Sequence, residues 1–200
     1  MPSINNEDDA AVSATACLPA LKAKLGSYDG FLVCCYSQHP LVQQLRSELR
    51  IAGLHDKIVS GIFGCSIAAC LQSINFNDNF GIVSTGQQWQ AILGDAVADL
   101  LGSSSSSRYA GTETTGLNAN ELHAIPVNEL NTCMKDATKR LLQRNVKAIC
   151  LGCAGMAGLN EVVRDACVEF LGVDRGSRIK IIDGVVAGVS FVESALRARY

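Results

Sequence analysis

Two kinds of hydrophobic segment alternate along this chain. Short, nearly continuous apolar runs, such as GFLVCC at residues 30–35, predict strands that are buried on both faces. Longer segments carry apolar side chains at helical spacing. We expect strands at 30–35, 57–62, 80–85, 108–113, 146–152 and 179–186, and helices at 7–25, 40–49, 64–73, 87–101, 130–143, 158–171 and 184–200.

The first helix, 7–25, has the clearest end signals. Asn5 or Asn6 can cap its start, and three acidic residues follow in the first turn, where the helix dipole favours negative charge. Pro19 lies inside this segment and predicts a kink or a break, because proline cannot donate a backbone hydrogen bond.

Strands that alternate with helices are typical of a parallel α/β sheet. Two stretches of the chain also match each other. When Cys35 is aligned with Cys153, the sequence GFLVCCYSQHPL matches AICLGCAGMAGL. The sequence KIVSGI (57–62) likewise matches KIIDGV (180–185). The repeat predicts two pseudo-symmetric flavodoxin-like lobes, residues 1–79 plus 184–200 and residues 80–183, with the active site in the cleft between them. The second half opens with a strand, a helix and a strand that have no counterpart in the first, so we expect the first lobe to lack that unit.

Composition narrows the class of protein. Hydrophobic residues make up 48% and charged residues 18% of 200 residues, which allows a sizeable core. The net charge of -2 argues against a nucleic-acid surface, which needs a basic face. No apolar run reaches the roughly 18 residues of a membrane span, and the acidic, polar start is unlike a signal peptide. We therefore expect a cytoplasmic protein with a small-molecule substrate; a homo-oligomer stays open.

Nine cysteines are many for this length, but an odd number in a chain without secretion signals argues against a disulfide framework. Cys35 and Cys153 differ from the others because each follows a predicted strand and precedes a small-residue turn and a helix. Ligands of open α/β sheets bind beyond the carboxyl ends of the strands. Amides in such turns lower the pKa of a thiol. Two facing thiols could remove a proton from one side of a carbon and return one to the other, which inverts a stereocentre.

These residues resemble a known family. CYSQHPL at 35–41 resembles the first-cysteine motif of hydantoin racemases, with His39 where that family commonly has proline. LGCAGMAGL at 151–159 resembles the second-cysteine motif, and GIVST at 81–85 the strand that begins the second lobe. The chain is therefore similar to the aspartate/glutamate/hydantoin racemase superfamily. The acidic residue usual in the segment at GIFGCS (61–66) and the N-terminal strand with an Asn-Pro-Asn-like motif are both absent.

The resemblance implies a racemase that needs no metal and no coenzyme, and that acts on a 5-substituted hydantoin such as allantoin. Cys35 and Cys153 would be the two catalytic bases. The substrate would be held by the residues around them, and backbone amides could stabilise the enolate oxygen; these residues are Tyr36, Ser37, Ser84, Thr85, Ala154 and Gly155. The alternatives are an aspartate or glutamate racemase, a related isomerase, or a chain that only binds ligand.

Other patterns allow rival interpretations. Cys150 and Cys153 form a C-x-x-C pair, which could indicate a redox or zinc site. Gly152, Gly155 and Gly158 follow a strand and open a helix, as in a nucleotide-binding turn, but their spacing departs from the usual motif.

The remaining candidates have simpler roles. His39 could act in acid/base chemistry, but a histidine at a helix start is more often at the surface or a cap. We expect Cys34 to point away from the site and pack in the core, and Cys65 and Cys70 to pack as small hydrophobes.

Overall fold

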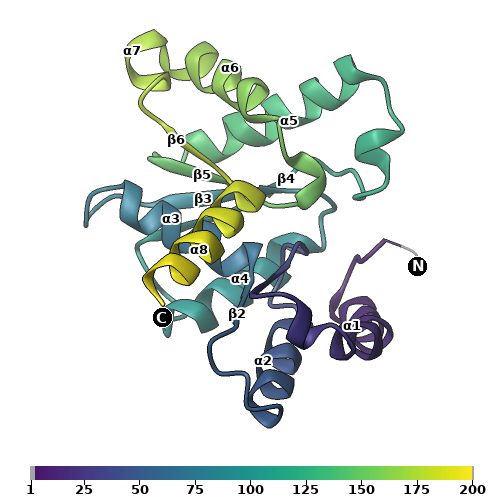
Figure 1. Cartoon of the computed structure of the whole chain (residues 1–200). Coiled ribbons are helices and arrows are strands. Elements are labelled where there is room, and N and C mark those ends of the chain that lie inside the picture. The colour runs from purple at the N-terminus through teal and green to yellow at the C-terminus, as the bar shows by residue number, and fades with distance from the viewer. Residues whose placement is uncertain (1–2, 200) are drawn as a thin grey trace.

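Two parallel sheets organise the computed structural model, which describes residues 3–199 (Figure 1). The smaller sheet pairs β1 (Gly30–Val33) with β2 (Ile58–Gly61). The larger sheet has the order β4-β3-β5-β6. Its strands are β3 (Phe80–Ser84), β4 (Tyr109–Thr114), β5 (Ala148–Leu151) and β6 (Lys180–Asp183). The prediction of an α/β fold with parallel sheets is confirmed.

The helices cover both sheets. They are α1 (Glu7–Lys22), α2 (Leu41–Ile51), α3 (Ile62–Ser73), α4 (Trp89–Leu101), α5 (Val127–Leu142), α6 (Asn160–Leu171), α7 (Val173–Gly176) and α8 (Gly184–Ala198), with short 3-10 turns η1 (Leu25–Ser27), η2 (Glu121–His123) and η3 (Ala154–Met156). α3 leaves the small sheet and packs on β5 and β6, whereas α8 leaves the large sheet and packs on β1 and β2. This exchange of helices holds the two sheets together. No helix of the described residues is both long and apolar enough to cross a membrane.

The internal repeat corresponds to a repeated arrangement of strands. β1 pairs with β2 so that Val33 lies opposite Gly61, and β5 pairs with β6 so that Leu151 lies opposite Asp183. In each pair a cysteine follows the end of the first strand, Cys35 after β1 and Cys153 after β5. The two cysteines therefore occupy equivalent positions in the two sheets.

Several predicted ends were wrong by a few residues. The first helix continues through Pro19 and ends at Lys22, without the predicted break, because α1 packs along α2. The strand predicted at 179–186 ends at Asp183, whose carboxylate accepts hydrogen bonds from the Val185 and Val186 amides at 2.8 and 3.3 Å and so caps α8. The Asn6 side chain caps α1, as predicted, by accepting from the Asp9 amide at 2.8 Å.

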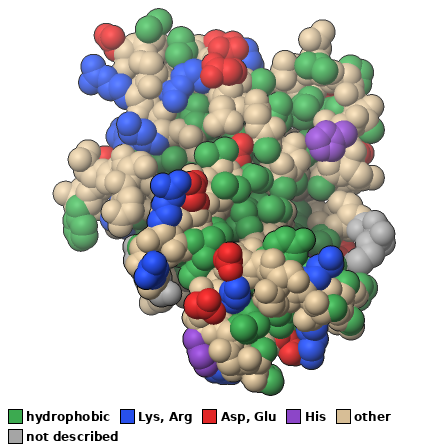
Figure 2. Space-filling model, in the orientation of Figure 1, with side chains coloured by type: hydrophobic (Ala, Val, Ile, Leu, Met, Phe, Trp, Pro, Cys, Tyr) green, Lys and Arg blue, Asp and Glu red, His purple; other side chains and the backbone are tan. Residues whose placement is uncertain are grey.

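The core has three parts. One packs β3 and β5 under α5 and α6, a second packs the opposite face of these strands against α3 and α4, and the smallest packs β1 and β2 against α1 and α2. Tyr36, which follows Cys35, is buried in the second part, so the first cysteine turn is anchored in the core of the large sheet. On the face in Figure 2, hydrophobic side chains gather near the middle, with acidic and basic side chains scattered around them.

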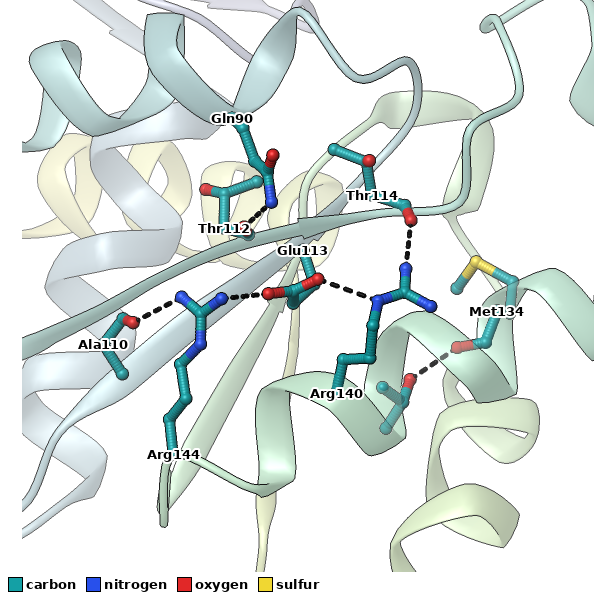
Figure 3. A network of polar contacts seen from close by, with 9 residues as sticks. Gln90, Ala110, Thr112, Glu113, Thr114, Met134, Arg140 and Arg144 are labelled. Carbon is teal, nitrogen blue, oxygen red and sulfur yellow. Dashed lines mark hydrogen bonds and ion pairs between the residues drawn. The ribbon is translucent and has the colours of Figure 1, made fainter.

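A polar network fixes the end of β4 to α5 (Figure 3). The buried Glu113 carboxylate accepts from Arg140 Nε at 2.9 Å and also from Arg144 Nη2. Arg140 Nη2 donates to the Thr114 carbonyl at 2.6 Å. The chain leaves β4 at this point for the loop that carries η2, so the network sets the start of that loop.

Candidate active site

A cavity of about 420 Å³ lies where β1, β3 and β5 end. Both Cys35 and Cys153 line it, which brings together two residues that are far apart in the sequence. Its size suits a small molecule. The full lining is Ser3, Ile4, Cys34, Cys35, Tyr36, Thr85, Trp89, Ala119, Asn120, His123, Gly152, Cys153, Ala154 and Gly155.

The Cys35 thiol is partly buried, and its Sγ lies 3.6 Å from the Ser37 hydroxyl. Burial raises the pKa of Cys35, the Ser37 hydroxyl lowers it, and the charge of an ionised Cys153 raises it further. The two thiols are thus close enough for the ionisation of one to oppose that of the other.

Cys153 immediately precedes the turn η3. Burial raises its pKa, and the backbone N–H groups of Gly155 and Met156 lower it by hydrogen bonding to the sulfur. The turn therefore holds the Cys153 thiolate better than a purely apolar site would. Because the two ionisations oppose each other, the arrangement disfavours a site in which both cysteines are thiolates.

Four of the predicted substrate-holding residues line the cavity: Tyr36, Thr85, Ala154 and Gly155. The Tyr36 hydroxyl lies 2.8 Å from Ser66 Oγ in the core, and this hydrogen bond holds the tyrosine ring in place. The Gly155 amide is directed at the Cys153 sulfur, which makes it a stabiliser of the thiolate.

The other two, Ser84 and Ser37, are outside the cavity lining. Ser84 is buried, and its hydroxyl donates to the Gly152 carbonyl at 2.9 Å. The Ser37 amide donates to the Cys35 carbonyl at 3.0 Å, and the Ser37 side chain lines a neighbouring hollow with α1 and α4. Neither is in the cavity lining, and the substrate-binding role of both stays a prediction.

Sequence reasoning missed several lining residues. Trp89 begins α4, and Asn120 and His123 come from the loop after β4. A polar loop at the carboxyl end of a strand in an open sheet was the available signal. The prediction for Cys34 was wrong: it is exposed and lines the cavity, because β1 ends at Val33 and strand alternation no longer applies.

The rival interpretations find simpler explanations. Cys150 lies in the core with its Sγ 3.1 Å from that of Cys70, so it does not share the surroundings of Cys153. No group of three or more potential metal ligands occurs among residues 3–199. A Cβ on Gly152 would lie 2.6 Å from Ile82 Cγ2, so close packing explains that glycine. His39 is buried, and its Nδ1 accepts from the Leu41 amide at 3.3 Å at the start of α2.

The chain was compared with known proteins. The uncharacterized protein C1F7.10 of Schizosaccharomyces pombe is 34% identical over 170 residues, which cover 84% of this chain and 63% of that protein. Protein DCG1 of Saccharomyces cerevisiae is 27% identical over 179 residues, which cover 79% of this chain and 66% of that protein. The chain thus spans slightly less than two thirds of the length of these relatives.

Similar solved structures include the allantoin racemase from Klebsiella pneumoniae and a glutamate racemase from Bacillus anthracis. The first has a TM-score of 0.72 at 21% identity and covers 99% of this chain and 72% of that one. The second has a TM-score of 0.60 at 12% identity and covers 94% and 65%. These similarities confirm the flavodoxin-like fold. The model of the Asp/Glu/Hydantoin racemase family matches residues 1–192, and the chain belongs to this family.

Proposed function

We propose that this protein is a racemase of 5-substituted hydantoins, allantoin among them, with Cys35 and Cys153 as its two acid/base groups. The observation that carries the proposal is that both thiols line one substrate-sized cavity and oppose each other's ionisation. A two-base reaction needs one thiolate and one thiol, and this coupling keeps the second thiol protonated once the first has ionised.

The reaction follows from these groups. The thiolate removes the proton from C5 of the hydantoin, and the electron pair moves into the neighbouring carbonyl to give an enolate. The opposite thiol then donates its proton to the other face of C5, and the electron pair returns from the oxygen. The two sulfurs have exchanged roles, the stereocentre is inverted, and no metal or coenzyme is consumed.

The cavity lining favours an uncharged substrate. None of the described residues that line it is Lys, Arg, Asp or Glu, whereas free aspartate or glutamate would bring charges that need partners. Tyr36 and Trp89 offer aromatic surfaces, and Thr85 and Asn120 offer polar groups suited to amide and carbonyl edges. We also propose that the protein acts in the cytoplasm. Whether it forms a homo-oligomer is left open.

The test is proton exchange at the stereocentre. Single enantiomers of allantoin and of a 5-alkyl hydantoin are incubated with the protein in D2O, and deuterium incorporation and optical rotation are followed. We expect exchange above the spontaneous rate, lost in Cys35→Ser and Cys153→Ser but kept in Cys133→Ser, whose thiol lies on α5 outside the cavity.

Parallel samples contain single enantiomers of aspartate and glutamate. Exchange with these alone would mean that the protein racemises free amino acids and not hydantoins. No exchange with any substrate, from protein whose circular dichroism shows a folded α/β chain, would overturn the proposal and leave a ligand-binding protein.

A further inference from the structure

The loop between β4 and α5 forms the cavity wall on the Cys153 side. Ala119, Asn120 and His123 of this loop line the cavity, and η2 packs against η3, the turn that follows Cys153. The wall is thus made by a segment that none of the sequence motifs includes.

Gly155 leaves a gap between an imidazole and a thiol. A Cβ placed on Gly155 would lie 3.3 Å from His123 Nε2 and 3.6 Å from Cys153 Sγ. Both atoms therefore border the same small space, which Leu122 Cδ1 also borders at 3.3 Å. His123 is also exposed, so its imidazole is in contact with solvent as well as with this space.

The position of His123 is well supported. The neighbouring Leu122 is buried, and the Ala124 amide donates to the Glu121 carbonyl at 3.0 Å. The amides of Thr115 and Gly116 tie the start of the loop to the Ser84 and Thr85 carbonyls at 2.9 and 3.1 Å. The imidazole thus lies beside Gly155 on a turn that is held in place at both ends.

The other charged and titratable groups around Cys153 do not provide this function. Cys34 and Cys35 line the same cavity, and Cys35 has the Ser37 hydroxyl as its neighbour. On β6, the Asp183 carboxylate accepts from the Gly158, Val185 and Val186 amides. Glu121 accepts from the Asn118 amide. Among the described residues that line the cavity, His123 carries the one imidazole.

We propose that His123 is a positioning residue for Cys153: the proton of the Cys153 thiol passes to His123 Nε2, and the resulting imidazolium stabilises the thiolate across the gap at Gly155. Cys153, rather than Cys35, is then the base in the resting protein. The assignment of Cys153 as a base rests on the proposed function, whereas the pairing of thiol and imidazole does not.

The experiment measures the pH dependence of Cys153 alkylation by iodoacetamide. Cys35 lies on a different tryptic peptide from Cys153. Cys150 and Cys153 share one peptide, and fragment ions in tandem mass spectrometry show which of the two is alkylated. In His123→Asn we expect alkylation of Cys153 to slow about tenfold near pH 7 and its midpoint to rise by about one pH unit, since one pKa unit is a tenfold change in ionisation. The Cys35 profile should not move to higher pH, because less Cys153 thiolate then opposes the ionisation of Cys35. His55→Asn, at a histidine outside the cavity, is the control and should behave as the wild type.

Two further variants separate charge from shape. His123→Lys keeps a positive charge and should restore part of the rate, and dissolved imidazole should restore part of it in His123→Gly. A Cys153 profile that is the same in His123→Asn as in the wild type would overturn the pairing. Because alkylation needs no substrate, a shifted profile in a protein without proton exchange would uphold the pairing and reject the racemase.

Discussion

The Ser84 hydroxyl donates a hydrogen bond to the Gly152 carbonyl at 2.9 Å, and both groups are buried. In return, the Gly152 amide donates to the Val83 carbonyl at 2.7 Å. These two bonds tie the end of β3 to the residue that precedes Cys153. The position of the second thiol therefore depends on β3 as well as on its own strand, β5.

Ser84→Ala should weaken this link. It removes one buried hydrogen bond and leaves the Gly152 carbonyl without that donor, which we expect to lower the free energy of unfolding by about 1–2 kcal/mol. Proton exchange should also slow, because the Cys153 turn is held less firmly. Urea denaturation and the D2O assay measure the two effects. The matched control is Ser73→Ala, whose exposed hydroxyl bonds within α3; equal losses in both variants would contradict the role given to Ser84.

Gly152→Ala should be strongly destabilising. The added Cβ would lie 2.6 Å from Ile82 Cγ2 and 2.8 Å from the Val83 carbonyl oxygen, and backbone cannot move aside as a side chain can. We expect a loss of about 1–3 kcal/mol by thermal or urea unfolding, the usual range for overpacking. Gly94→Ala is the contrasting variant. Apart from its chain neighbours and the backbone of α4 itself, no atom lies within 4 Å of its Cβ position, so this change should be neutral or stabilising by up to about 1 kcal/mol.

The exchange rate should depend on pH as a rise followed by a fall. Burial raises the pKa of both Cys35 and Cys153, so the thiolate is scarce at neutral pH and becomes more abundant as pH increases. At still higher pH the second thiol also ionises, and the proton donor is lost. The rate of deuterium incorporation measured at several pH values tests this sign. A rate that falls steadily from neutral to alkaline pH would contradict the proposal that the active site needs one cysteine as a thiolate and the other as a thiol.

Glu113→Gln should loosen the link between β4 and α5. The change keeps the shape of the side chain but removes the charge that pairs with Arg140 and Arg144. Since both guanidinium groups are partly exposed, we expect a modest loss of about 1–2 kcal/mol in urea denaturation. The control Glu193→Gln breaks the exposed pair with Arg197 and should cost less than about 0.5 kcal/mol. A Glu113 effect as small as the control would mean that solvent screens the network.

The sequence by itself determined the order of strands and helices and the placement of Cys35 and Cys153 at strand ends. Both are local properties: an apolar run of a given length forms a buried strand wherever it packs, and the residue after it lies at the carboxyl edge of the sheet. The motifs around the two cysteines also identified the family. Errors at this level include element ends, as at Asp183, where a single capping side chain ends the strand and starts a helix, and the short helix α7, which was not predicted.

Only the tertiary structure decided which side chains share the cavity. The Ser84 hydroxyl bonds to the Gly152 carbonyl, and His123 lies with Cys153 beside Gly155. Each of these depends on contacts between segments far apart in the chain, brought together by the pairing of β3 with β5 and by the packing of η2 on η3. No periodicity along the sequence encodes such contacts, because they arise from the packing of whole elements against one another.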